Sequence, residues 1–254
     1  AGRLTRLFDK QRNRDVLTAG KIGNDWQLFE DRPGTYNAWD LLDRYEDHPI
    51  DIGAWRSCEV AEVGPLSTAL RLRRTFGATS AEQIVRIYAD SPRIDFETHV
   101  DWRENERILK VAFPLAIKAR HYVTDTSAGG MERPNHRNTT WEQARFETCC
   151  HKWVYMGEGR FGVGLMNDGK YGCDVRGDTM RLSLLRAPIR PDRTSDRGEH
   201  RFTYSLWLDD GSWTAGGLVE AAYDLNWPLT ATPGRKARPD FLQGLLRLSS
   251  PALH

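Results

Sequence analysis

The pair His99 and Asp101 has the His-x-Asp spacing that recurs in metal sites. On an extended strand both side chains would point to one face, about 7 Å apart. The sequence ties no other His or Cys to this pair, and the polar face of an amphipathic strand accounts for both residues. A lone His-x-Asp is a weak signal, so we predict no metal site here.

The segment 132–142 (Glu-Arg-Pro-Asn-His-Arg-Asn-Thr-Thr-Trp-Glu) is dense in charged and hydrogen-bonding groups. Such a loop could hold a sugar through its hydroxyls, with Trp141 as a stacking platform. It could equally bond to itself and brace a neighbouring domain, and this structural role is the interpretation we favour.

Two further loops carry more charge than a turn requires. In Asn-Asp-Gly-Lys-Tyr-Gly at 167–172, a tight Asp-Gly turn explains Asp168 and Gly169 but leaves Lys170 and Tyr171 unexplained. In the segment 191–200, turn chemistry accounts for Gly198 but not for the surrounding charges. For both loops two interpretations stay open. The loop either contacts a ligand or another domain, or is a plain solvated loop.

No catalytic machinery is evident in the pattern of residues. Carboxylates are plentiful, but a glycosidase acid and base must lie about 5–9 Å apart across a sugar, which sequence cannot establish. The serine-hydrolase elbow, the phosphate-binding loop and the zinc-protease motif are all missing from the chain. We therefore assign no catalytic residue to this chain.

The elements that would position these loops are strands. Apolar residues alternate with polar ones along 94–102, which predicts a half-buried antiparallel strand. We expect further strands at 84–88, 109–117, 160–166, 180–186 and 201–208, with Pro114 marking a sheet edge or a bulge. Long helices are not expected. The fold class is therefore all-β, a large antiparallel sandwich decorated by long ordered loops at 23–47, 124–153, 167–178 and 188–200.

Composition excludes several classes of protein. The chain of 254 residues has 36 Lys and Arg against 35 Asp and Glu, which argues against a nucleic-acid partner. No apolar run approaches the about 18 residues of a membrane span, so no membrane partner is expected. The four cysteines, 58, 149, 150 and 173, lack zinc-ligand spacing and are interpreted as free thiols in a reducing compartment.

Both ends of the chain suggest that it is one piece of a longer protein. Residues 2–10 resemble a turn and the second strand of a hairpin whose first strand is missing, and residues 245–254 form a strand-like stretch with no partner. We expect residues 1–254 to be a single β-domain excised from a longer chain.

Taken together, the loops resemble one known family. In order along the chain, they are similar to the C-terminal β-domain of glycoside hydrolase family 38 α-mannosidases, in the branch of the vacuolar, cytosolic-type and bacterial enzymes. The blocks that carry the resemblance are 28–33, 38–40, 101–102, 109–115, 132–134, 138–141, 144–147, 151–153, 167–175, 182–186 and 196–204.

The resemblance implies properties that spacing does not show. Family members are zinc-dependent retaining exo-α-mannosidases that release terminal α-linked mannose from oligosaccharides. Their zinc ligands, aspartate nucleophile and acid/base lie on an N-terminal barrel that this chain lacks. The chain would then bind no metal or cofactor itself, and would be inactive alone. The domain would be a supersandwich, similar to galactose mutarotase, that packs on its own barrel and completes the active-site rim.

The resemblance also implies a binding residue. An arginine from an Asp-x-Arg-Gly-like loop of the β-domain reaches the substrate, and Arg197 is the best match. Asp168, Lys170 and Tyr171 would line the same rim. The expected location is cytoplasmic, and homo-oligomerisation stays open. Two rival functions also stay open: a stand-alone lectin-like carbohydrate-binding module, and a mutarotase-like epimerase with a His and a Glu as acid and base.

Overall fold

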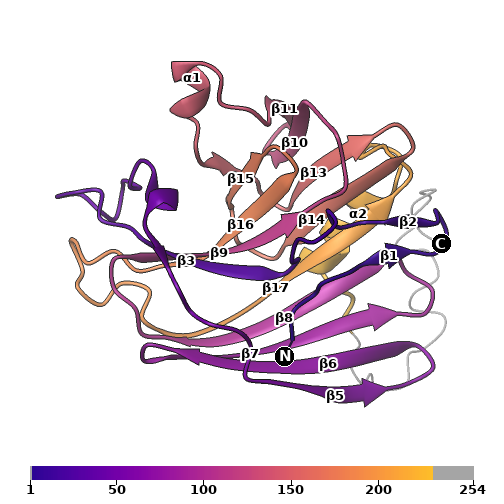
Figure 1. Cartoon of the computed structure of the whole chain (residues 1–254), viewed down its shortest axis with the longest axis horizontal. Helices are drawn as coiled ribbons and strands as arrows, with labels where there is room; N and C mark the ends of the chain where they lie inside the picture. Colours follow the sequence, from indigo (N-terminus) through magenta and orange to yellow (C-terminus); the bar gives the residue numbers. More distant parts are fainter. Residues whose placement is uncertain (1, 231–254) are drawn as a thin grey trace, which may run out of the picture.

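Two antiparallel sheets packed face to face make up most of the molecule (Figure 1). The computed structural model describes residues 2–230. It confirms the all-β class predicted from the alternating pattern. Within residues 2–230, helix is confined to three short pieces: η1 (Tyr45–Asp47), α1 (Thr140–Gln143) and α2 (Leu218–Asn226).

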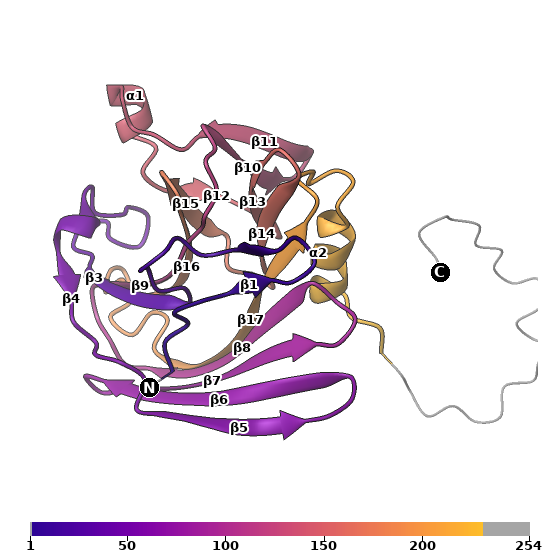
Figure 2. The same ribbon diagram turned by 45° about the vertical axis from the view of Figure 1, so that its right-hand side comes forward.

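The larger sheet has nine strands and is strongly bent. Figures 1 and 2 show β5 to β8 lying almost flat while β14, β13, β10 and β11 rise at an angle beyond β17. The order across the sheet is β11 (Gly129–Pro134), β10 (His121–Thr126), β13 (Trp153–Glu158), β14 (Phe161–Asn167), β17 (Gly198–Asp209), β8 (Arg93–Trp102), β7 (Thr79–Tyr88), β6 (Ser67–Phe76) and β5 (Ser57–Val63).

The smaller sheet has six strands and packs against the inner side of this bend. Its order is β12 (Thr148–Cys149), β15 (Gly172–Arg176), β16 (Thr179–Arg186), β9 (Arg107–Pro114), β3 (Asp25–Glu30) and β4 (Pro49–Ile50). A separate hairpin pairs β1 (Phe8–Asp9) with β2 (Arg14–Asp15).

The core between the sheets is apolar and rich in aromatic rings. Phe96 of β8 stacks on Tyr204 of β17 with ring centroids 5.0 Å apart, and lies 5.5 Å from Phe113 of β9. The alternation predicted for 94–102 is confirmed, because Ile94, Phe96, Val100 and Trp102 are all buried in this core. Burial of these side chains is the main stabilising term for the sandwich.

Both faces of the six-stranded sheet are covered. All residues of β9 except the first are buried. Two segments cover the outer face: the loop 31–48, which carries η1, and the arm 135–147, which carries α1 (Figure 1). A second small cluster, Phe29, Tyr45 and Ile108, packs beneath the loop.

The helix α2 packs on the outer face of the nine-stranded sheet, against β14. The side chain of Leu218 packs very close to the backbone of β14. A Cβ atom added at Gly164 would lie only 2.3 Å from a methyl carbon of Leu218. The glycine in this strand is therefore required by the approach of the helix.

Three expectations from the sequence are wrong in detail. Pro114 marks neither an edge nor a bulge: it ends the central strand β9, and the bulge in the β9–β16 pair lies between Ser183 and Leu185. Proline is tolerated there because it is the last residue of the strand. The segments 23–47, 124–153 and 167–178 are not only loops, since they contain the short strands β3, β10 to β12 and β15.

The N-terminal expectation is also wrong. Phe8 and Asp9 form the first strand of a hairpin, not the second. The turn that follows is closed by Asp9, whose Oδ1 accepts from the backbone N–H groups of Gln11 and Arg12 at 2.9 and 3.1 Å. The strand predicted at 245–254 lies outside the described residues. Among the helices of residues 2–230, none is long and apolar enough to span a membrane.

Candidate functional site

A buried group of charged side chains lies on the outer face of the six-stranded sheet. Val111, Leu182 and Val175 point into the core, so the residues beside them in β9, β16 and β15 point outward. Those neighbours are Lys110, Arg181 and Asp174. Because the loop 31–48 and the arm 135–147 cover this face, the three charges are removed from water.

Lys110 is the centre of this group and is fully buried. Its Nζ lies 2.5 Å from Glu147 Oε2, 2.6 Å from Asp174 Oδ1 and 3.0 Å from the Tyr45 hydroxyl. Burial alone would lower the pKa of Lys110, but the two carboxylates outweigh it and raise the pKa well above its usual value. Lys110 is therefore held as an ammonium group and is unsuited to act as a general base.

Arg181 continues the network toward the loop 31–48. Its Nε lies 3.0 Å and its Nη2 2.6 Å from Asp174 Oδ2, and it also pairs with Glu46. Burial raises the pKa of Asp174 to about 6, with Lys110 acting in the opposite direction. Every charge at the centre of this network has a partner. The role of the network is therefore structural: it holds the loop 31–48 and the arm 135–147 on the sheet. We call Lys110, Glu147, Asp174, Arg181 and Glu46 the anchoring network.

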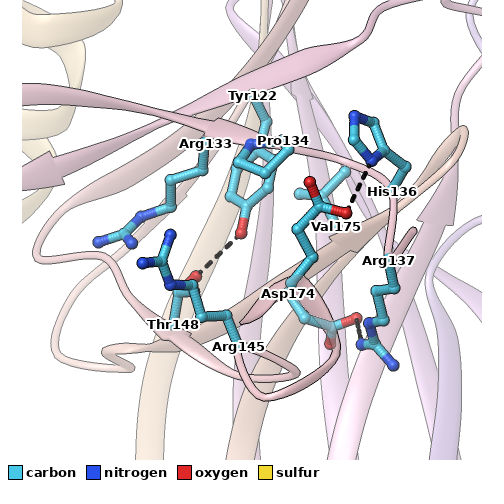
Figure 3. A pocket seen from close by; sticks show the side chains of 10 residues that line it. Tyr122, Arg133, Pro134, His136, Arg137, Arg145, Thr148, Asp174 and Val175 are labelled. Atoms are coloured by element: carbon cyan, nitrogen blue, oxygen red, sulfur yellow. Dashed lines mark hydrogen bonds and ion pairs between the residues drawn. The ribbon is translucent and has the colours of Figure 1, made fainter. Parts of the chain in front are cut away.

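A small pocket lies beside this network, between the β10–β11 hairpin and the arm (Figure 3). The free volume inside it is about 20 Å³, which is space for a water-sized group. Tyr122 and Thr148 are in contact within it, with their hydroxyl oxygens 3.2 Å apart. The remaining lining residues are Arg133, Pro134, His136, Arg137, Glu142, Arg145, Asp174 and Val175.

Two of the residues predicted to bind substrate lie together beside the middle of β17. Asp168 Oδ2 accepts from the backbone N–H of Thr203 at 2.7 Å, which fastens its loop to that strand. The Nζ of Lys170 lies 4.4 Å from the centroid of the Phe202 ring. Partial burial lowers the pKa of Lys170, while Asp168 and Asp196 act to raise it. The loop 167–172 is therefore fastened to β17, and Asp196 of the segment 191–200 is near enough to influence Lys170.

The other two predicted binding residues are more separate. Arg197 is exposed in the turn before β17, and its side chain bonds to no other described residue; only its backbone N–H is engaged, with Thr194 O at 3.1 Å. Tyr171 is 57% exposed, and its ring lies 5.7 Å from that of His151. The substrate role of these four residues stays a prediction.

The remaining sequence candidates are surface features. His99 Nε2 lies 3.6 Å from Glu199, a residue of the neighbouring strand. Trp141 is 78% exposed near the tip of the arm, where α1 is closed by a capping box between Thr139 and Glu142. Within residues 2–230, no three His, Cys, Asp or Glu side chains are grouped so that they could hold a metal ion.

Sequence reasoning missed the anchoring network. Lys110, Glu147 and Asp174 occur in the blocks that carry the family resemblance, but nothing in their spacing places them together. The available signal was Lys110 itself, a lysine between two apolar neighbours in a strand. All four cysteines are free; Cys150 and Cys173 are buried, and Cys58 and Cys149 are exposed.

The family model for the glycosyl hydrolases family 38 C-terminal domain matches residues 1–194. The chain belongs to this family. The match ends just before Arg197, so the family model itself does not reach that residue.

Curated relatives match nearly the whole chain. Alpha-mannosidase 2C1 of Homo sapiens is 38% identical over 254 residues, which is 99% of this chain and 24% of that protein. Alpha-mannosidase G of Dictyostelium discoideum is 37% identical over 231 residues, or 89% of this chain and 21% of that protein. This family 38 domain thus spans about a quarter of the length of the curated relatives it matches.

A solved structure has the same fold. An alpha-mannosidase from Enterococcus faecalis V583 superposes with a TM-score of 0.76 at 18% identity, over 89% of this chain and 29% of that one.

Proposed function

We propose that this chain is the C-terminal β-domain of a retaining α-mannosidase, which hydrolyses terminal α-linked mannose in oligosaccharides. The observation that carries the proposal is the extent of identity: 38% over 99% of the chain, shared with a protein named as an alpha-mannosidase. The domain would pack on the catalytic barrel of the parent protein and complete the rim of its active site. The expected location of the parent protein is the cytoplasm.

The zinc that the family resemblance implies would belong to the parent protein. The residues of this chain do not fit such a site, because no three ligating side chains in residues 2–230 are grouped to hold a metal ion. We therefore derive no step through zinc here. The nucleophile and acid/base would likewise lie on the barrel, which leaves binding and positioning to this domain.

Arg197 is the residue that we propose to contact substrate. Its guanidinium is exposed and bonds to no other described residue, so its five N–H donors are free for adjacent sugar hydroxyls. Asp168 and Lys170 lie on the neighbouring loop and would flank the same sugar. Tyr171, directed toward His151, would contribute at the outer edge of this rim.

The test compares the isolated chain and the complete enzyme on 4-nitrophenyl α-mannoside. The isolated chain should release no nitrophenol, with or without zinc. In the complete enzyme, Arg197→Ala should lower kcat/KM about tenfold or more, because it removes a charged hydrogen-bond donor to the substrate. Arg193→Ala, an exposed arginine of the same loop, is the matched control and should leave the kinetics unchanged.

The two outcomes separate the parts of the proposal. Unchanged kinetics in the Arg197→Ala enzyme would remove this residue from the rim but leave the domain assignment standing. Zinc-dependent turnover by the isolated chain would overturn the division between barrel and β-domain.

One observation favours a lectin-like function as the second candidate. Tyr223 and Trp227 of the α2 region stack with ring centroids 5.4 Å apart and are 49% and 64% exposed. Stacked exposed rings are suited to the apolar face of a sugar. Titrating the isolated chain with a mannose oligosaccharide while following tryptophan fluorescence would detect such binding.

Two His–Glu pairs that an epimerase could use are closed by direct contact. His121 and His136 each touch a glutamate directly, at 3.2 Å in both pairs. An acid and a base acting on one sugar would need to face each other across the ring, and these pairs leave no space for it.

A further inference from the structure

The small pocket between the β10–β11 hairpin and the arm has an unusual charge arrangement. In Figure 3 the guanidinium groups of Arg133 and Arg145 lie on the same side of the pocket, next to the Tyr122–Thr148 contact. Arg133 comes from β11 and Arg145 from the arm, so two separate elements bring these positive charges together.

Neither guanidinium has an anionic partner within the part of the chain that the structure describes. Arg133 donates only through Nε, to Thr124 Oγ1 at 3.0 Å, and no bond or ion pair joins the side chain of Arg145 to a described residue. Arg137, in the same pocket, shows the contrast: it pairs with Glu46 at 3.3 Å and donates to Phe146 O at 3.2 Å.

The two carboxylates that line the pocket are already engaged. Glu142 Oε2 accepts from the backbone N–H of Asn138 at 2.6 Å and lies 3.2 Å from His136 Nδ1. Asp174 is held by Lys110 and Arg181 in the anchoring network. The pocket therefore carries two unneutralised positive charges, and each guanidinium keeps free N–H donors at its Nη atoms.

We propose that this pocket binds the oxyanion of a phosphate group, with Arg133 and Arg145 as its ligands. Each guanidinium presents a planar fork of donors that matches two phosphate oxygens, and a phosphate has enough oxygens to engage both forks. The free space of about 20 Å³ admits one group of water size, so a phosphate oxygen enters while the remainder of the ligand stays outside.

The ligand is either inorganic phosphate or the phosphate ester of a sugar, and the two sources can be distinguished. Isothermal titration of the complete 254-residue chain at low salt would use inorganic phosphate, mannose 6-phosphate and mannose as separate probes. We expect the two phosphates to bind and mannose to produce no heat from this pocket. Tighter binding of mannose 6-phosphate identifies a sugar ester as the ligand, whereas equal or weaker binding identifies free phosphate.

Variants locate the site. Arg145→Gln and Arg133→Gln should each weaken phosphate binding about tenfold or more, because each removes a charge-assisted pair of hydrogen bonds. Arg201→Gln, an exposed arginine on β17, is the matched control and should bind as the unaltered chain does. A circular dichroism spectrum of each variant confirms that it is folded.

Three results would overturn the proposal. The first is no phosphate binding by the unaltered chain at millimolar concentration. The second is unchanged binding in both folded variants, Arg133→Gln and Arg145→Gln. The third is acetate binding as tightly as phosphate, which would assign the pocket to a carboxylate instead. The measurement involves no turnover, so its outcome is independent of the proposed α-mannosidase function.

Discussion

Replacing Lys110 by methionine would test whether the anchoring network stabilises the fold. Methionine has nearly the same length and no charge, so the substitution removes the ammonium group without leaving a large cavity. It would leave Asp174 and Glu147, which lie 2.6 and 2.5 Å from Nζ, without their central cation.

The expected loss in the free energy of unfolding is about 3 kcal/mol at pH 7. Breaking a buried ion pair costs about 3–5 kcal/mol because the remaining charge is uncompensated. The lower end applies here, because Asp174 keeps Arg181 as a partner and the Glu147 side chain is 18% exposed. The assay is urea unfolding of the isolated chain, and Lys118→Met, at an exposed lysine, is the control, with an expected change within about 0.5 kcal/mol.

The pH dependence of the variant provides a second check. Burial raises the pKa of Asp174 above that of the unfolded chain and Lys110 opposes this rise, so without Lys110 the folded state should bind a proton at Asp174 more tightly. Its free energy of unfolding should therefore rise as the pH falls from 7 to 5, and part of the loss should be recovered. A loss below about 1 kcal/mol at pH 7, or no recovery at pH 5, would refute this account of the network.

Two further predictions concern buried polar groups. Burial raises the pKa of Asp174 to about 6, above its value in an unfolded chain, so the contribution of Asp174 to stability should decline as the pH rises from about 4 to about 6. Denaturant midpoints across that range should show this decline, and Asp174→Asn should abolish it; the same slope in both proteins would contradict the assignment. Tyr204→Phe should cost about 2–3 kcal/mol in urea unfolding, because the hydroxyl bonds to Asn24, Gln83 and Trp26 at 2.6, 2.8 and 3.0 Å. Tyr36→Phe, at a side chain 71% exposed, is the control, and an equal effect of the two substitutions would show that the buried hydroxyl has no special role.

The sequence predicted the strands well where one face is apolar. The alternation at 94–102 identified the core residues of β8 because each apolar side chain there points inward. The same rule is less informative for β9, which is buried on both faces. Lys110 lies between Leu109 and Val111, and the pattern shows only that it points away from them, not that a loop and an arm cover it.

Long-range contacts explain what sequence could not supply. The charged residues of the anchoring network are distributed from Glu46 to Arg181 along the chain and meet only through the pairing of β9, β15 and β16. β11 and β12 were missed for a local reason: β11 has no buried residue and β12 has only two residues, so neither shows an apolar alternation. Lys170 and Tyr171 were singled out because they exceed what a local turn needs, which is a local signal, and their substrate role stays a prediction.

Lys110 is the buried link between two segments that also meet through Arg137 and Glu46. Its ammonium group contacts Tyr45 in the loop 31–48 and Glu147 at the end of the arm 135–147. Release of either segment would weaken the hold on the other, so their local opening should be cooperative. By thermodynamic reciprocity, a partner that orders the arm must favour the ordered loop by the same free energy. The buried lysine thus contributes to making two surface segments respond as a single unit.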